Sequence, residues 1–176
     1  NPLKSEAEMT GVELQYINLL ASEARLKTER DGAATIAWGD ELAKHFNADD
    51  TRVAEAKRLQ EQLFNSRKAE FNSQVSSLQE QITGLSTVLS SRKLQQRSLD
   101  EEMVSTRKLA KDGFVPMAQA NQVERQKSDV DSSIASTQAD IARAKLQIAQ
   151  VRSTLLKDVD TQLQELQKNR DAMLSR

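Results

Sequence analysis

One short stretch of the chain, residues 111–116, combines residue types that could bind a partner protein. Its sequence is Lys-Asp-Gly-Phe-Val-Pro. Gly113 can adopt the positive φ that ends a helix, and Pro116 cannot lie inside one. The stretch is therefore predicted to stop one helix and start another. If the two helices fold back on each other, Phe114 and Val115 become exposed apolar residues at the tip, where they are available for contact with a partner.

The apolar side chains at this tip are Leu109, Phe114 and Val115, and Arg107 and Lys111 place positive charge around them. This group of side chains could insert between the helix ends of a partner. Its small area predicts weak binding by a single tip. Alternatively, Phe114 only packs back on the last turn of the preceding helix, as an apolar residue just past a helix-ending glycine often does. The two interpretations are compatible, and the sequence leaves both open.

Residues suited to catalysis or metal binding are sparse. The chain has no cysteine, which excludes disulfides, thiolate metal sites and a cysteine nucleophile. His45 is the only histidine, so a plain surface or packing role is favoured over a metal or acid–base role. Asp49 and Asp50 are better explained as a helix N-cap than as a catalytic carboxylate pair. The sequence therefore predicts no enzyme activity, no metal and no cofactor.

The composition is typical of long helices and coiled coils. Only 3% of residues are aromatic, and the chain has 5 glycines and 2 prolines, so it should bury a narrow seam and form no deep substrate pocket. A net charge of -1 without any basic block argues against a nucleic-acid-binding protein and against a dimer that curves membranes with a basic face. No apolar run could span a bilayer and no signal peptide opens the chain, so we expect a soluble protein or a soluble piece of a larger one.

Residues 1–48 are expected to form an N-terminal region with one helix and a connecting segment. Residues 1–10 are polar and should fray, whereas helical spacing of apolar residues continues to residue 30 and Asp31-Gly32 ends it. Residues 31–47 break this periodicity and predict a loop with a short helix. An apolar cluster there should pin the first helix against the longer helices, and its members are Ile36, Trp38, Leu42 and Phe46.

Residues 49–176 are expected to form a long hairpin, with a helix over 49–112, a tip over 113–116 and a helix over 117–176. Apolar residues recur on alternating steps of three and four, which is a heptad repeat. In the first helix they are Phe64, Phe71, Val75, Leu78, Ile82, Leu85, Leu89, Leu99 and Met103, with Lys68, Arg92, Gln96 and Thr106 in the remaining seam positions. In the second they are Val123, Val130, Ile134, Thr137, Ile141, Ala144, Ile148, Val151 and Leu155.

Each predicted helix is on the order of 90 Å long. Two helices of similar length with a short joint predict an antiparallel pair, because that arrangement buries both seams within one chain. The predicted fold class is therefore all-α, a long antiparallel two-helix coiled-coil hairpin with a shorter third helix at its base.

Reflecting positions about residue 114 gives the expected register. Leu89 should then lie near residues 139–141 and Ile82 near residues 146–148, so that apolar meets apolar. Towards the tip the seam turns polar at Arg92 and Gln96, which predicts looser packing there. These two residues either set the register or are tolerated surface residues whose stems lie along the apolar seam. Both explanations remain open.

Several segments resemble a known family. These are residues 23–32 (Glu-Ala-Arg-Leu-Lys-Thr-Glu-Arg-Asp-Gly), the following 36–38 (Ile-Ala-Trp), the tip with Leu109 four residues before Gly113, and residues 140–145 (Asp-Ile-Ala-Arg-Ala-Lys). Together they resemble the periplasmic helical domain of type I secretion adaptors, the membrane fusion proteins of Gram-negative bacteria. The similarity covers essentially the whole chain. It is greatest to the branch for protease and lipase export, related to the haemolysin adaptor (HlyD-like).

This resemblance implies more than the spacing does. Family members have an N-terminal inner-membrane anchor, a lipoyl-like domain that is split by a helical hairpin, and a β-barrel domain, so this chain would be the hairpin alone. The adaptors surround an inner-membrane ABC exporter as a ring, which is expected to be hexameric. Their hairpin tips meet a TolC-like outer-membrane channel in the periplasm. The resemblance implies no catalysis, and membrane contact only through the missing anchor.

The tip departs from one pattern of the wider adaptor family. That pattern has an arginine, a leucine four residues later and a serine or threonine seven residues further on. Leu109 matches the leucine, but Ser105 and Pro116 occupy the other two positions. The tip contacts are therefore not expected to copy those of the efflux adaptors. The alternative function is an antiparallel coiled-coil spacer or scaffold protein with no transport role.

Overall fold

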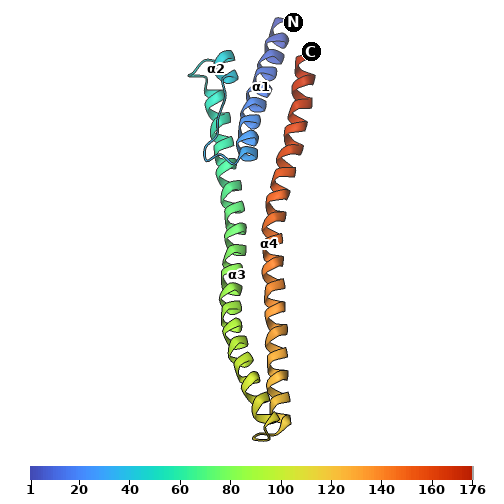
Figure 1. The fold of residues 1–176 in the computed structure, drawn as a ribbon. Coiled ribbons are helices and arrows are strands. Elements are labelled where there is room, and N and C mark those ends of the chain that lie inside the picture. The colour runs from blue at the N-terminus through green and yellow to red at the C-terminus, as the bar shows by residue number, and fades with distance from the viewer. Residues whose placement is uncertain (176) are drawn as a thin grey trace. The chain divides into compact units, whose positions relative to one another are not determined.

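The computed structural model describes residues 1–175 of the chain, and within that range it contains helices and no strands. The helices are α1 (Pro2–Asp31), α2 (Glu41–His45), α3 (Thr51–Lys111) and α4 (Met117–Leu174) (Figure 1). The predicted all-α fold with a long antiparallel hairpin, formed by α3 and α4, is confirmed. Within residues 1–175, no helix combines the length and the apolar character needed to cross a membrane.

The chain forms two compact units, and both long helices contribute to each. The terminal unit comprises Asn1–Ser73 and Val151–Arg176, and the turn unit comprises Gln74–Gln150. The sequence-based division into residues 1–48 and 49–176 separates the N-terminal region from the hairpin, whereas the two compact units are defined by which residues pack together. That division therefore stays a prediction.

Helix α1 begins earlier than expected. The side chain of Asn1 accepts a hydrogen bond from the Leu3 N–H, 3.1 Å away, and Pro2 occupies the first turn, where its missing N–H costs no helical hydrogen bond. Residues 2–10 are therefore helical, although their polar character suggested fraying. The helix ends where predicted, because Gly32 adopts the left-handed conformation with φ 69°.

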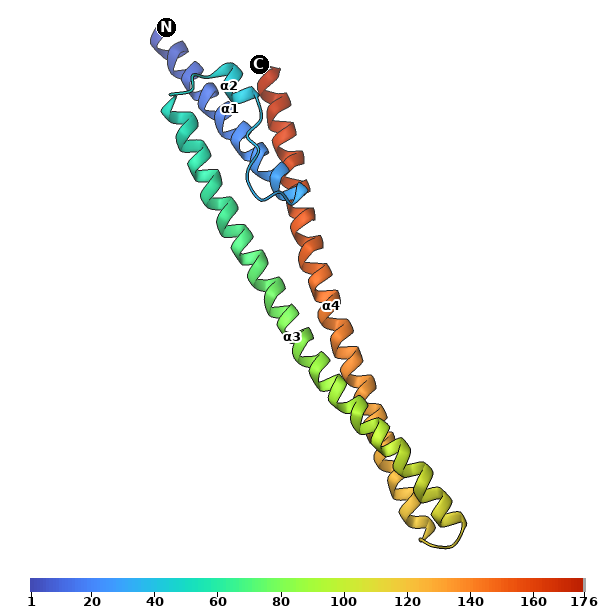
Figure 2. The ribbon, with the colours of Figure 1, turned by 60° about the vertical axis from the view of Figure 1, so that its left-hand side comes forward.

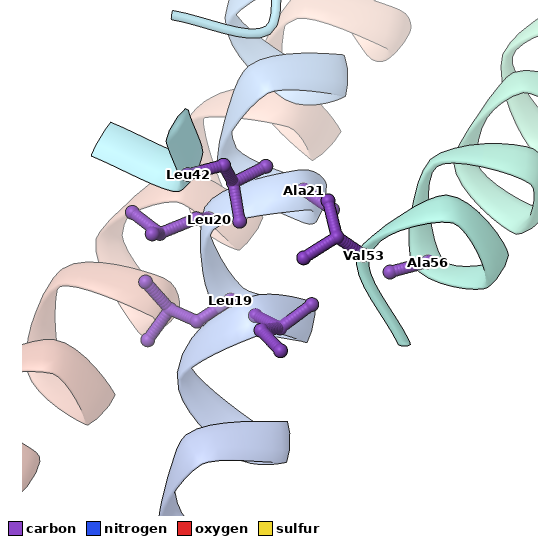
Figure 3. Packing of buried hydrophobic residues seen from close by; sticks show 7 residues of the cluster. Leu19, Leu20, Ala21, Leu42, Val53 and Ala56 are labelled. Atoms are coloured by element: carbon purple, nitrogen blue, oxygen red, sulfur yellow. The ribbon is translucent and has the colours of Figure 1, made fainter. Parts of the chain in front are cut away.

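The terminal unit has an apolar core formed by all four helices. Its buried residues are Ile17, Leu19, Leu20 and Ala21 of α1, Leu42 of α2, and Val53 and Ala56 of α3, with Leu166 and Met173 of α4 packed against them. Figure 3 shows Leu42 reaching α1 from α2, and Val53 from α3. In Figure 2, α1 accordingly lies beside the N-terminal part of α3 and the C-terminal part of α4. The predicted apolar cluster is confirmed, since Ile36 packs with Phe64 and Trp38 contacts both groups.

A buried ionic network joins three helices of the terminal unit. The Arg25 side chain is only 5% exposed, and its Nη1 lies 2.7 Å from Glu29 Oε2, while its Nε donates to Gln60 of α3. Arg67 of α3 donates to Glu29 Oε1 at 2.6 Å and to Asp158 of α4 at 3.0 Å. Burial lowers the pKa of Arg25, and the Glu29 carboxylate opposes this shift. Glu29 therefore compensates a guanidinium that is almost removed from water.

A second network of ion pairs and hydrogen bonds connects α2 with α1 and α4 in the same unit. Arg170 of α4 donates to Glu23 of α1 at 3.2 Å and to Glu41 of α2 at 2.6 Å. Tyr16 donates its hydroxyl to Glu41 at 3.1 Å. The hydrogen bond from Arg170 holds the pKa of Glu41 below its usual value, whereas burial and the neighbouring Glu41 raise the pKa of Tyr16. The short helix α2 is thus tied to both α1 and α4.

The turn unit buries a narrow seam between α3 and α4. Its buried apolar seam residues are Val75, Val123, Ile134 and Ala144, each less than 9% exposed, and the seam threonines Thr106 and Thr137 are buried as well. The other predicted apolar seam residues of this unit are half-buried, as expected where only two helices pack together. The predicted heptad repeat is confirmed in both helices.

Candidate functional site

The turn between α3 and α4 is held by backbone hydrogen bonds of a Schellman motif. The Phe114 N–H donates to the Leu109 carbonyl at 2.8 Å, and the Gly113 N–H donates to the Ala110 carbonyl at 3.2 Å. Gly113 has φ 82°, the left-handed conformation that this motif requires. Pro116 follows as the residue before Met117, where α4 begins. The helix stop and helix start expected at residues 113–116 are both present.

This turn yields a matched pair of predictions on glycine. We expect Gly113→Ala to destabilise the chain by about 1–2 kcal/mol, because an alanine is strained at positive φ. Gly84→Ala lies inside α3 and should stabilise by about 1 kcal/mol, since alanine is the better helix former. A Cβ at either position would meet no atom within 4 Å, so only backbone preference separates the two variants. Urea denaturation followed by circular dichroism measures both, and shifts of the same sign would contradict the assignment of the turn.

Apolar side chains at the turn are exposed although the backbone is ordered by hydrogen bonds. Phe114 is 77% exposed and Leu109 is 44% exposed, while Val115 is half-buried. A capping contact would bury the Phe114 ring against the last turn of α3, and an exposure of 77% leaves little of the ring in such a contact. Of the two roles considered for Phe114, the exposure favours contact with a partner.

Met117 was missed by the sequence reasoning, and it is 56% exposed. The sequence predicts it only as the first residue of the second long helix. The signal that could have identified it is its position next to Pro116, outside the heptad seam. With Met117 the apolar surface of the turn comprises four side chains, Leu109, Phe114, Val115 and Met117, and we call these four residues the turn patch.

The predicted cationic residues of the site differ in their contacts. Arg107 forms an ion pair with Glu124 of α4, so its charge is already compensated across the two helices. Lys111 is exposed in the last turn of α3 together with Lys108, where positive charge is favourable next to the free carbonyl groups of the helix end. The structure therefore places positive charge beside the turn patch, and it pairs the charge of Arg107 with Glu124 of α4.

Polar seam residues make hydrogen bonds between α3 and α4. Arg92 donates to the Ser133 carbonyl at 3.3 Å and to the hydroxyl of Thr137, and Gln96 donates to Asp131 at 2.6 Å. The midpoints of these pairings fall at the turn, in agreement with the predicted register. The hydrogen bonds therefore favour a register-setting role over a merely tolerated surface position.

Charges are coupled between the same two helices nearer the turn. Lys127 lies 3.1 Å from Asp131 and 3.4 Å from Asp100 of α3. The hydrogen bond from Gln96 and the Lys127 ammonium hold the pKa of Asp131 below its usual value, and the Asp131 carboxylate raises the pKa of Lys127. Positioning of the turn patch thus depends on polar contacts as well as on the apolar seam.

The other candidate residues have structural contacts. His45 lies in the last turn of α2 with its ring in an edge contact with Tyr16, at a centroid distance of 5.9 Å. Asp50 accepts a hydrogen bond from the Arg52 N–H at 2.9 Å, as an N-cap residue of α3 does, and Asp49 is exposed. Hydrogen bonds from the Arg52 side chain and N–H lower the pKa of Asp50. Within residues 1–175 no cluster of three potential metal ligands is found.

Comparisons with known proteins give one consistent result. A family model described as AprE, long alpha-helical hairpin, matches residues 5–176. The alkaline protease secretion protein AprE of Pseudomonas aeruginosa is 30% identical over 182 residues, covering 96% of this chain and 42% of AprE. The soluble domain of LipC, a membrane fusion protein of a type I secretion system, is similar in structure with a TM-score of 0.55 and 30% identity. That match covers 98% of this chain and 86% of the LipC chain. Both relatives are secretion proteins and not enzymes.

Proposed function

This chain belongs to the AprE family of long α-helical hairpins, and from that premise we propose that it is the hairpin of a periplasmic adaptor for type I protein secretion. The resemblance seen in the sequence is thereby confirmed at the level of the family. The chain spans 42% of the length of AprE, so the activity of a whole adaptor is part of the proposal. In this proposal the adaptor is anchored to the inner membrane through parts outside residues 1–176.

The proposed partners follow from that role. The adaptor would connect an inner-membrane ABC exporter with a TolC-like outer-membrane channel, and it would associate into a ring, which we take to be hexameric. The turn patch would dock on the channel. Supporting this proposal, the patch exposes apolar side chains on a hydrogen-bonded turn, and Lys108 and Lys111 beside it are exposed. Each such contact is small, so a ring of tips would gain affinity through multivalency.

The single observation that carries this proposal is the 77% exposure of Phe114. A coiled-coil spacer needs a turn that closes, and the Schellman motif closes it with backbone groups alone. A spacer therefore gains nothing from a large apolar ring exposed to water at the turn. A docking tip gains binding free energy from such a ring, because burial of an aromatic ring contributes to binding in proportion to the area removed from water.

A cross-linking experiment tests the docking, and it uses the absence of cysteine in the chain. We expect a single cysteine at the exposed Asp112 to form adducts with the outer-membrane channel in cells that export actively. A cysteine at Ser86, which is exposed on α3, is the matched control and should not. Adducts only between hairpins, or equal adducts from both positions, would contradict docking through the turn and favour the spacer function.

A further inference from the structure

A pocket of about 170 Å³ lies in the terminal unit, where α1 ends beside α3 and α4. Its apolar lining comes from Phe64 and Phe71 of α3 and from Leu155 of α4. Gly32 and Ala33, which follow the end of α1, complete one side. Phe64 is 6% exposed, whereas Phe71 and Leu155 are half-buried, so apolar surface remains open within this pocket.

Lys68 lines the same pocket at a position where the heptad repeat calls for an apolar residue. Its side chain is exposed. The Lys68 ammonium lies 3.4 Å from the Ala34 carbonyl and 5.7 Å from the centre of the Phe64 ring. It makes no ion pair within residues 1–175, and its neighbours three and four positions away on α3 are asparagines and phenylalanines.

The charged residues next to Lys68 already compensate one another. Arg67 is paired with Glu29 and with Asp158, and Glu29 is also paired with Arg25. Two cations and two carboxylates therefore balance in this network. Lys68 adds one positive charge at the pocket that no carboxylate of this network balances. A ligand with a single negative charge would therefore complement the site.

We propose that this pocket binds a small aryl carboxylate, with its ring against Phe64 and Phe71 and its carboxylate paired with Lys68. The size agrees with one ring, because an engineered apolar cavity of about 150 Å³ is known to accept benzene. Aromatic rings prefer tilted or offset contacts with other rings, and two phenylalanines provide them. The negative charge would come from the ligand, since no carboxylate among residues 1–175 pairs with Lys68.

The test is a titration of the 176-residue chain with phenylacetate, followed by nuclear magnetic resonance. We expect saturable shifts of the amide signals of Ala33, Lys68 and Asn72, which line the pocket. The chain has a single tryptophan, Trp38, which packs against the cluster containing Phe64, so one indole N–H signal gives a second readout. The neutral analogue phenylacetamide should bind about three- to fivefold more weakly, because it lacks the ion pair.

Variants separate the contributions of charge and shape. Lys68→Gln should weaken phenylacetate binding by about three- to fivefold and leave phenylacetamide binding unchanged. Ala33→Phe should abolish the shifts by occupying the pocket, while Lys93→Gln, which removes an exposed lysine of the turn unit, should change nothing. The proposal would be overturned by a lack of saturable shifts, by equal binding of acid and amide, or by binding that persists in Ala33→Phe. None of these outcomes bears on docking of the turn patch, because the probe reports only on the terminal unit.

Discussion

Phe114→Asp will abolish protein export by the adaptor proposed to carry this hairpin, while the purified chain keeps its helical content. The ring is 77% exposed, so its loss removes almost no packing from the hairpin. An aspartate at the same position places a charge in the contact that the turn patch would make, and a charge buried without a partner costs several kcal/mol. In the proposed ring every hairpin would carry the change, so the loss would be multiplied over all tips. The measurement is the amount of exported protein in the medium, together with circular dichroism of the chain.

Leu94→Asp is the matched control for this prediction. Leu94 is 63% exposed, lies on α3 in the same turn unit and is distant in sequence from the turn. Export should persist in this variant, whereas Leu109→Asp within the turn patch should block it as Phe114→Asp does. A lower melting temperature of the Phe114→Asp chain would instead assign the ring a structural role. Equal loss of export in Leu94→Asp would show that any added charge on α3 is harmful.

Glu29→Ala will lower the free energy of unfolding by about 3–5 kcal/mol, which is the usual cost of leaving a buried charge without its partner. The Glu29 side chain is 6% exposed and receives hydrogen bonds from Arg25 and Arg67. Without the carboxylate, Arg25 stays charged and 5% exposed, with only Gln60 to accept from it. Urea denaturation of the variant and of the original chain gives the difference directly.

Glu55→Ala supplies the control for that loss. Glu55 pairs with Arg58 on the surface of α3, where both side chains are more than half exposed, so the expected change is at most about 1 kcal/mol. A combined replacement, Arg25→Met with Glu29→Leu, should recover most of the stability lost in Glu29→Ala, since it removes both buried charges together. If Glu29→Ala proves no more destabilising than Glu55→Ala, then water reaches Arg25 and the network does not hold the helices together.

The hairpin could be predicted from the sequence because its signals are local. A glycine three residues before a proline marks the turn, and apolar residues at heptad spacing mark the seam on each side. Reflection about residue 114 then gives the register, and the hydrogen bonds of Arg92 and Gln96 with α4 agree with it. Even the N-cap at Asp50 follows from residue type alone.

The ionic networks could not be predicted, because they join residues far apart in the chain. Arg67 is 38 positions from Glu29 and 91 from Asp158, and sequence spacing gives no guide to such pairings. The early start of α1 was missed for a different reason. Asn1 and Pro2 favour a helix start through capping and a preset φ, whereas the polar composition of the following residues dominated the prediction. The exposure of the Met117 side chain could not be predicted either, because it depends on the direction in which α4 continues after the turn.

The same backbone motif ends α1 and α3, and the comparison shows which part of residue 114 the turn needs. After Gly32 the Ala33 N–H donates to the Thr28 carbonyl, just as the Phe114 N–H donates to the Leu109 carbonyl after Gly113. One position carries a methyl group and the other a benzyl group, so the motif uses the N–H and not the side chain. Residue 114 is thus free to diverge in evolution without any change to the turn. With docking through the turn patch as proposed, related secretion systems would acquire separate partner preferences by substitution at this single position.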